Sequence, residues 1–290
     1  MYLLFDIGGS HMRFTYSTDG TSINKESIEV YDTPDTFKEG VQKFEKACSE
    51  LNINKDEIGY VSGGIAGTFG KQKKKLVSSP NLPQWEDKPL EKQIFEVLDA
   101  EVFIDNDTVM GGLGEANEGA GKDYDIVAYI AFGTGIGGAK ISKGKPDSHM
   151  YGFEPGHQII KCEKPSKCGL SPESGYGKFG HWESLAGGWA IEEKYSQRAS
   201  ELTREQCEKI MDWISLGLTN ITLLWSPEVF VLGGGIIADD VFNLDYLEES
   251  VSKRLNVFPE PPKVKKARLG DYSGLHGAMS YCNIFRNKND

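Results

Sequence analysis

The chain has 290 residues, a hydrophobic content of 39% and a formal net charge of −11. This length is enough for two ordinary domains, and the apolar content supports folded cores and argues against disorder. The negative charge disfavours binding to nucleic acids or to anionic membranes, because the protein's field would repel those polyanions. The dense basic run KQKKK at 71–75 is expected to be a solvated loop or a hairpin tip.

The cysteine content favours a reducing compartment. There are five cysteines, unevenly spaced, and this odd count gives no disulfide framework. The first residues enter a strand without a basic, signal-like segment, and no run of about 18 apolar residues occurs. We therefore expect a soluble, cytoplasmic protein that does not contact a membrane.

The first part of the chain is predicted to alternate strands and helices. Residues 2–17 have the pattern of a β-hairpin closed by glycines. Apolar residues at helical spacing predict a helix over 34–51, with Thr33 or Asp35 as its N-cap. The next predicted elements are a strand that opens 58–70, a short helix over 90–99 and a strand over 101–107.

A second block begins near residue 123 and repeats the theme of the first. Its opening, YDIVAYIAFGTGIGGAKI, is again strand, glycine turn, strand, and it echoes FDIGGSHMRF. A loop-rich insert over about 145–182 is followed by predicted helices over 189–202 and 204–225, a strand that ends in LGGG, and a last helix that begins in GDYSGLHGA. Two such blocks suggest two related α/β lobes that face each other across a cleft.

Two glycine turns are candidate phosphate sites, because glycine amides can converge on an anion. DIGGS at 6–10 also suits an ordinary tight hairpin, so both interpretations stay open. FGTGIGG at 132–138 has more glycines than a hairpin requires, which favours phosphate contact. Neither stretch matches a P-loop or a Rossmann fingerprint. LGGG at 232–235 either lies against a nucleotide or simply turns the chain from strand to helix.

The stretch FIDND at 103–107 places carboxylates directly after a strand. A carboxylate at the end of a strand is well placed to accept a proton from a hydroxyl. Adjacent strand residues point to opposite faces, so Asn106 and Asp107 can act together only if the chain bends there. The following TVMGG is therefore expected to begin a helix. The alternative is that Asp105 or Asp107 caps this helix, and for Asp105 we favour capping.

Several segments together resemble the ROK sugar kinases, which belong to the actin, hexokinase and Hsp70 ATPase superfamily. They run in order from Phe5 to about Ala278: FDIGGSHMR, SPNLPQW, IDNDTVMGGLGE, FGTGIGGA, EPGHQII, GHWESLAGG, VLGGG and LGDYSGLHGA. The resemblance implies an α/β fold of two ribonuclease-H-like lobes, with mixed sheets flanked by helices and a cleft between the lobes. It implies a smaller N-terminal lobe over 1–120, to which a helix over 275–290 returns, and a larger C-terminal lobe over 121–274.

The resemblance also implies a set of site residues. Asp107 matches the general base of the family, and on this ground we favour catalysis over capping for it. Asp6 resembles the acid that organises Mg²⁺. The predicted sugar contacts are Gly67, Asn81, Asn106, Asp107, Glu154, His157 and Glu183. The predicted contacts with ATP are Asp6, Gly8, Gly9, Ser10, Gly133, Thr134, Gly135, Gly137, Gly233, Gly234 and Gly235.

The implied activity is phosphorylation of a hexose at its 6-hydroxyl with ATP and Mg²⁺, and glucose is the favoured acceptor. An N-acylhexosamine, either N-acetylglucosamine or N-acetylmannosamine, is the second choice. A non-catalytic sugar-binding or regulatory ROK protein is the alternative of another class, and polyphosphate is an alternative donor. ROK repressors carry an amino-terminal DNA-binding segment, whereas the first strand here begins at Tyr2, so we expect no nucleic-acid partner. The resemblance also implies a homodimer.

The family's zinc motif is only partly kept. His157 and Cys168 remain, but the first and last cysteines of the family motif fall at Ser166 and His181. Cys162 would complete a set of two histidines and two cysteines, which suits Zn²⁺. The alternative is that packing and hydrogen bonds order this loop and that both cysteines are free thiols.

Overall fold

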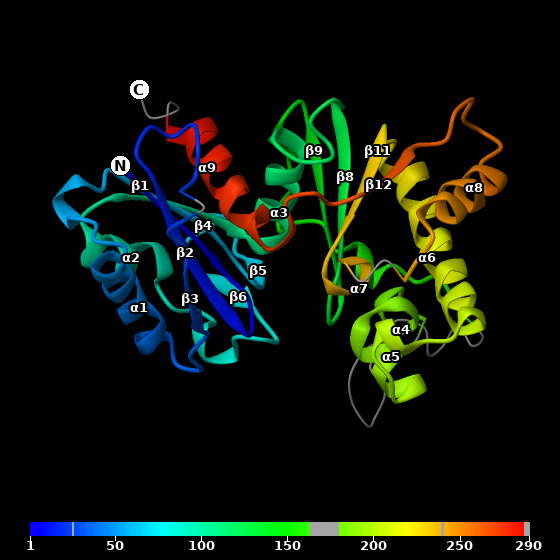
Figure 1. Cartoon of the computed structure of the whole chain (residues 1–290), viewed down its shortest axis with the longest axis horizontal. Helices are drawn as coiled ribbons and strands as arrows, with labels where there is room; N and C mark the ends of the chain where they lie inside the picture. Colours follow the sequence, from blue (N-terminus) through cyan, green and yellow to red (C-terminus); the bar gives the residue numbers. More distant parts are fainter. Residues whose placement is uncertain (25, 163–179, 239–240, 287–290) are drawn as a thin grey trace. The chain divides into compact units, whose positions relative to one another are not determined.

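The structure is a computed structural model that describes residues 1–24, 26–162, 180–238 and 241–286. The chain forms two compact units (Figure 1). The first comprises Met1–Gly119, Gly144–Gly152 and Asp271–Asp290, and the second comprises Ala120–Lys143 and Phe153–Gly270. Each unit contains a mixed sheet with helices packed on it, so the predicted α/β fold class is confirmed.

The first unit is built on a five-stranded mixed sheet of order β3-β2-β1-β4-β7. The predicted hairpin is present, because β1 (Tyr2–Ile7) pairs antiparallel with β2 (His11–Ser17). β4 runs parallel to β1, and β7 runs parallel to β4, so these three strands end at the same edge of the sheet. The other strands are β3 (Glu29–Asp32), β4 (Tyr60–Ile65), β7 (Glu101–Asn106) and the two-stranded ribbon of β5 (Thr68–Phe69) and β6 (Leu76–Ser78).

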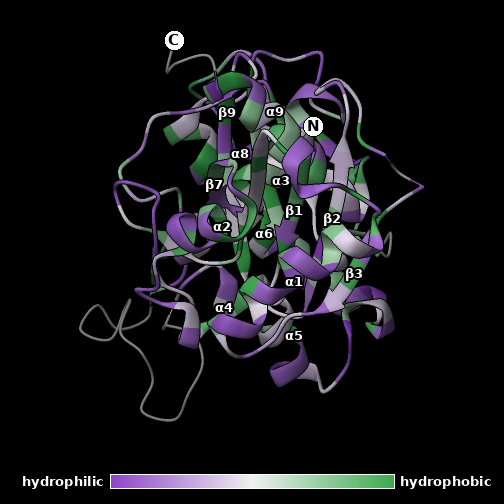
Figure 2. Cartoon of the chain, turned by 90° about the vertical axis from the view of Figure 1, so that its left-hand side faces the viewer, coloured by the Kyte–Doolittle hydropathy of each residue, from purple (hydrophilic) through white to green (hydrophobic). Residues whose placement is uncertain are grey.

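Alternate residues of β1 belong to two hydrophobic cores, because successive side chains of a strand point to opposite faces. Leu3, Phe5 and Ile7 pack in one core, and Tyr2 and Leu4 pack in the other. Both sets are buried, so this strand is apolar along almost its whole length. Figure 2 shows the central strands largely in hydrophobic colours, whereas α1 and α2 carry hydrophilic residues on their outer faces.

The helices of the first unit begin near their predicted positions. α1 (Phe37–Glu50) is capped by Thr36, whose hydroxyl accepts a hydrogen bond from the Glu39 amide at 3.3 Å. The prediction of Thr33 or Asp35 as the cap was wrong, because both residues precede the first helical turn. The other helices of this unit are α2 (Leu90–Leu98), α3 (Asp107–Asn117) and α9 (Ser273–Phe285).

Glycines allow α3 to pack closely against α9. A Cβ at Gly277 would lie 1.7 Å from the Met110 carbonyl oxygen, and one at Gly114 would lie 2.2 Å from the Ser273 carbonyl oxygen. A side chain at either position would force the helices apart. The close contact therefore holds the two helices in a fixed relation within the first unit.

The second unit repeats the strand directions of the first. β8 (Ile126–Phe132) and β9 (Ile136–Ser142) form an antiparallel hairpin. β11 (Val229–Gly233) lies parallel to β8, and β12 (Lys263–Lys266) lies parallel to β11. The order β9-β8-β11-β12 thus corresponds to β2-β1-β4-β7, and the repeated sequence pattern reflects the hairpin that opens each of these sheets. The two-residue strand β10 (Lys145–Pro146) follows β9 in the chain.

The long helix of the second unit, α6 (Arg204–Trp225), matches its predicted bounds. Thr203 and Gln206 form a capping box at its start. The helix predicted over 189–202 is shorter, because α5 (Gly188–Tyr195) ends at Ser196 in a left-handed conformation. The remaining α-helices of this unit in the described residues are α4 (Glu183–Ala186), α7 (Gly235–Ala238) and α8 (Leu244–Arg254).

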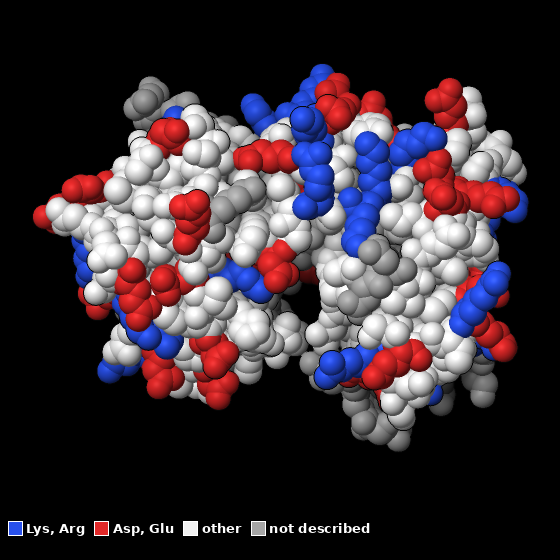
Figure 3. Space-filling model, in the orientation of Figure 1, with Lys and Arg blue, Asp and Glu red and all other residues white. Residues whose placement is uncertain are grey.

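One face of the molecular surface carries charged side chains of both signs (Figure 3). On the face shown in Figure 3, Lys and Arg lie beside acidic residues and do not form one continuous basic surface. Among the residues that the structure describes, no helix has both the length and the apolarity that a membrane span requires.

Candidate active site

The junction between β7 and α3 is fixed by Asn106. Asn106 is the N-cap of α3, and its Oδ1 accepts hydrogen bonds from the Thr108 amide at 2.8 Å and the Val109 amide at 3.3 Å. Its Nδ2 donates to the Gly67 carbonyl oxygen at 2.9 Å. The chain therefore bends directly after the strand, as predicted. The side-chain amide of Asn106 makes these three hydrogen bonds, and one N–H of its Nδ2 is left to donate to a ligand.

Asp107 is the first residue of α3, at the end of the helix where the backbone dipole favours negative charge. The Thr108 amide donates to its Oδ1 at 2.9 Å. The neighbouring strand β4 approaches this residue closely, since a Cβ at Gly64 would lie 2.8 Å from the Asp107 Cα. The side chain is partly buried. The backbone of α3 therefore binds this carboxylate, and β4 packs against the Asp107 backbone.

Asp6 lies near the end of β1 and interacts with the charge of Asp107. Burial and, next, the charge of Asp107 raise the pKa of Asp6 to about 7, while Arg13 opposes the shift. The Asp6 carboxyl group lies against the start of α9, because a Cβ at Gly274 would come within 2.7 Å of it. We call Asp6 and Asp107 the carboxylate cluster. Two acids in this arrangement favour a shared proton or a bound cation.

The first glycine turn contacts Asn81. The Gly8 amide donates to the His11 carbonyl oxygen at 2.9 Å and closes the β1–β2 hairpin. A Cβ at Gly9 would lie 2.8 Å from the Cβ of Asn81, so only glycine permits this approach. Ser10, next along the turn, is exposed. Two predicted contacts, one for phosphate and one for sugar, are thus direct neighbours.

The second glycine turn, in the other unit, is supported by the start of α5. The Gly188 amide donates to the Gly133 carbonyl oxygen at 2.9 Å, and the Trp189 amide donates to that of Thr134 at 3.0 Å. A Cβ at Gly135 would lie 2.8 Å from the Glu183 Oε2. Gly137 lies within β9. The turn therefore packs directly on a residue predicted to bind sugar.

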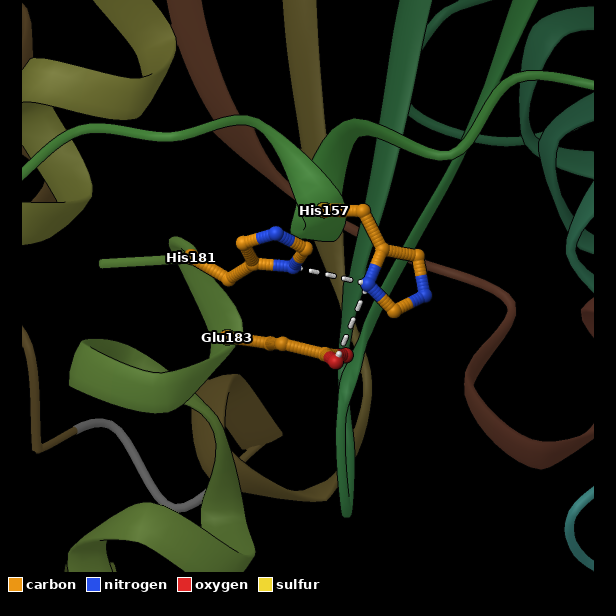
Figure 4. Close-up of side chains that lie close together, drawn as sticks. All are labelled: His157, His181 and Glu183. Carbon is orange, nitrogen blue, oxygen red and sulfur yellow. Dashed lines mark hydrogen bonds and ion pairs between the residues drawn. The ribbon is translucent and has the colours of Figure 1, made fainter. Parts of the chain in front are cut away.

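Glu183 also belongs to a cluster with two histidines (Figure 4). The Nδ1 atoms of His157 and His181 are 3.1 Å apart, and the His157 Nδ1 is 3.3 Å from the Glu183 Oε1. The histidine rings meet edge to face, with centroids 5.2 Å apart. We call His157, His181 and Glu183 the histidine cluster. His181 is buried whereas His157 is exposed, so the cluster presents His157 to solvent.

The histidine cluster has the composition of a metal site, because one ligand atom from each of its three residues lies within 4.8 Å of the others. Two histidines and a carboxylate suit Zn²⁺. Of the two cysteines of the predicted zinc set, Cys162 is exposed and Cys168 lies outside the described residues. Glu154 immediately precedes the short turn of Pro155–His157 and is exposed.

The three glycines that lead from the end of β11 into α7 differ in their surroundings. A Cβ at Gly233 would lie 2.6 Å from the Tyr129 hydroxyl, and Gly234 has a φ of 87°, which favours glycine. Gly235 begins α7, and no atom lies within 4 Å of a Cβ built there. The first two glycines are therefore explained by the turn itself, and Gly235 is the one with space beside it.

Asp105 does not cap α3, which corrects the sequence prediction for this residue. The cap is Asn106, and the Asp105 carboxylate instead pairs with Lys73 at 2.5 Å. Lys73 belongs to the basic run at 71–75, which forms the tip of the β5–β6 hairpin as predicted. This pair was not predicted from the sequence, where the only signal for it is the density of lysines in the run.

The profile of the ROK family matches residues 2–283, and the chain belongs to this family, as its motifs indicated. The N-acetyl-D-glucosamine kinase of Shigella flexneri is 28% identical to this chain over 308 residues, which cover 96% of this chain and 98% of the relative.

Solved structures share the fold. The ROK hexokinase of Thermus thermophilus has a TM-score of 0.81 at 24% identity, with 100% of this chain and 99% of that chain covered. A ROK family glucokinase of Streptomyces griseus, in complex with glucose and AMPPNP, has a TM-score of 0.77 at 24% identity, with 99% of each chain covered. At such identities the likeness establishes the α/β fold alone.

Proposed function

We propose that this chain transfers the γ-phosphate of ATP to the 6-hydroxyl of a hexose, with glucose as the favoured acceptor. Membership of the ROK family, together with its curated relatives, makes it a sugar kinase, that is, a phosphotransferase with an alcohol group as acceptor. The main observation in support of phosphate transfer to the 6-hydroxyl is the position of Asp107 at the N-terminus of α3, where its charge interacts with that of Asp6.

Asp107 is proposed to accept the proton of the attacking hydroxyl. Phosphoryl transfer requires an aligned hydroxyl, an acceptor for its proton and stabilisation of charge on the phosphate oxygens. A carboxylate at a helix N-terminus suits the second requirement, because the helix dipole favours its charged form. The backbone contacts of Asp107 with Thr108 and with β4 support this role, since they limit its movement.

Asp6 fits the proposed role of organising Mg²⁺. Its carboxyl group is partly withdrawn from water and interacts with the charge of Asp107. A divalent cation would offset both the lost hydration and the repulsion between the two carboxylates. When bound, the ion supplies positive charge to the phosphate oxygens. The phosphates are proposed to accept hydrogen bonds from the glycine turns, at Gly8, Gly9, Ser10, Gly133, Thr134, Gly135 and Gly137. The adenosine is proposed to lie beside Gly233, Gly234 and Gly235, where Gly235 has open space.

The sugar is proposed to bind through the polar groups and the glycine that the family resemblance implied. Its proposed contacts are Gly67, Asn81, Asn106, Glu154, His157 and Glu183. A site of this kind rejects the wrong epimer because a missing hydroxyl would leave a buried partner without a hydrogen bond. The contact between Asn81 and Gly9, and that between Glu183 and Gly135, support coupling of sugar and phosphate binding within each unit.

An N-acylhexosamine is the second candidate acceptor. The relative with 28% identity over almost the full chain is an N-acetyl-D-glucosamine kinase, which favours this class. Glucose and N-acetylglucosamine share the 6-hydroxyl, so the proposed role of Asp107 is the same for both. Only the contacts near the second carbon of the sugar would differ.

The experiment is an ADP-release assay with a panel of hexoses and N-acylhexosamines. It compares wild type with Asp107→Asn and with the matched control Asp123→Asn, an exposed residue of the second unit. We expect turnover to fall at least about a hundredfold in the first variant, the scale of a general base, and to be unchanged in the control. Retained turnover in Asp107→Asn would assign the base to another residue, and inactivity of wild type with every sugar would favour a non-catalytic sugar-binding protein.

A further inference from the structure

Three of the four lysines in the basic run at 71–75 are paired with acids. Lys73, Lys74 and Lys75 reach Asp105, Glu91 and Asp87 at 2.5, 3.6 and 2.5 Å. The pairs of Lys74 and Lys75 are exposed, and exposed ion pairs contribute little to stability. The pair of Lys73 differs, because the side chain of Asp105 is only 3% exposed. This difference singles out Lys73 within the run.

Lys73 is also held in an unusual backbone conformation. Its φ is 57°, in the left-handed region that residues other than glycine seldom adopt. Its amide donates to the Gly70 carbonyl oxygen at 2.8 Å, within the turn that joins β5 to β6. The hairpin tip thus directs the ammonium group toward the end of β7. Such a conformation persists only where surrounding contacts compensate for it.

Asp105 joins three separate segments of the first unit. Its Oδ1 accepts hydrogen bonds from the Lys73 ammonium group at 2.5 Å and from the Asn106 amide at 2.8 Å. Its Oδ2 accepts a bond from the Tyr281 hydroxyl of α9 at 3.2 Å. Burial and the charge of Asp105 raise the pKa of Tyr281, so the phenol remains a donor. A buried carboxylate of this kind requires a positive partner.

The network leads directly to the carboxylate cluster. The backbone amide of Asn106 donates to Asp105, while its side chain caps α3 and donates to the Gly67 carbonyl oxygen. Asp107 follows as the first residue of the helix. The direction in which Asp107 points therefore depends on the backbone that Asp105 fixes. Gly67 immediately precedes β5, so Lys73 and Asn106 connect the same hairpin to β7 at two points.

We propose that Lys73 is a positioning residue for the phosphoryl-transfer reaction. Its ion pair with Asp105 fixes the Asn106–Asp107 backbone and aligns the general base with the hairpin that carries Gly67. Lys73 contacts neither substrate in this proposal, and it acts through Asp105. The inference rests on the proposed function of Asp107 for its kinetic consequence, but not for its structural one.

The test compares Lys73→Met with Lys74→Met, a matched control that removes the same charge one residue away. The variants Lys73→Arg, Asp105→Asn and Lys73→Met/Asp105→Asn complete the set. For Lys73→Met we expect kcat to fall at least tenfold, while KM for ATP changes less than threefold, because alignment is lost but the phosphate contacts remain. Lys73→Arg should retain most of the wild-type kcat, and the kcat of Lys74→Met should stay within twofold of wild type. The kcat of the double variant should be no lower than that of Lys73→Met.

A second readout does not require activity. Amide hydrogen exchange of a peptide that spans Asn106–Val109 should become at least tenfold faster in Lys73→Met and should not change in Lys74→Met. The proposal is overturned if Lys73→Met behaves as Lys74→Met, if the losses of Lys73→Met and Asp105→Asn multiply in the double variant, or if exchange rises equally throughout the first unit. If wild type phosphorylates no sugar, the proposed function fails, and the exchange measurement alone decides the inference.

Discussion

Replacing Asp6 with Asn should stabilise the folded chain at neutral and alkaline pH. The pKa of Asp6 is raised from 3.8 to about 7, chiefly by burial and then by the charge of Asp107. A raised pKa means that the carboxyl group favours the folded state below pH 3.8 and loses this contribution as pH rises toward 7. At about 1.4 kcal/mol for each pH unit, the upper limit of the loss is about 4 kcal/mol. Partial relaxation of the site lowers the expected gain for Asp6→Asn to about 2 kcal/mol at pH 8.

The assay is urea unfolding of wild type and Asp6→Asn at pH 4.5, 6 and 8, followed by amide exchange of β1, whose Leu3, Leu4 and Phe5 are fully buried. The difference in unfolding free energy between the two proteins should be small at pH 4.5 and should grow in favour of the variant up to pH 8. Asp32→Asn, at an exposed position, serves as the control and should show no such trend. A variant that is less stable than wild type at pH 8, or a difference that does not depend on pH, would refute the reasoning. The variant should also lose phosphotransfer activity.

Three further changes test the packing described above. Gly277→Ala should lower the unfolding free energy by about 2–3 kcal/mol, because its Cβ would meet the Met110 carbonyl oxygen at 1.7 Å. Gly235→Ala should lower it by less than about 1 kcal/mol, because no atom lies within 4 Å of a Cβ built there. Urea unfolding measures both changes. Gly135→Ala should displace Glu183 and raise KM for the sugar about fivefold or more. The control Ser142→Ala, later in β9, should leave KM unchanged. If Gly135→Ala also leaves KM unchanged, Glu183 does not contact the sugar. Trp182→Phe should destabilise the second unit by about 2 kcal/mol, because it removes the hydrogen bond that the Trp182 Nε1 donates to the Trp213 carbonyl oxygen at 2.9 Å. An unaltered midpoint of thermal unfolding would contradict this prediction.

The parts of the fold that depend on local pattern could be predicted from the sequence. The apolar run of β1, the glycine turn and the alternation in β2 specify a hairpin without reference to the rest of the chain. The bend after Asn106 could be predicted in the same way, because a strand followed by small residues and a good cap leaves few alternatives. The same reasoning placed α6 at its observed bounds.

The parts that depend on distant partners could not be predicted. The role of Asp105 is decided by Lys73 and Tyr281, which lie far from it in the chain, so its own neighbours suggested only a cap. The choice of Thr36 as the cap of α1 depends on where the first helical turn begins, which periodicity locates only to within a few residues. The zinc set that the family resemblance implied already grouped His157 with His181, so their proximity could be anticipated, but the edge-to-face orientation of the two rings could not.

The glycine-lined contact between α3 and α9 has a consequence for the order of synthesis. α3 leaves the ribosome before the second unit is made, whereas α9 follows it. Until α9 emerges, the small residues of α3 and the apolar residues Tyr2 and Leu4 of β1 lack the surface that covers them. A nascent chain therefore cannot assemble the environment of Asp6 and Asp107 early, and a premature stop before residue 273 would yield a polypeptide with an exposed sheet face that quality-control proteases can recognise.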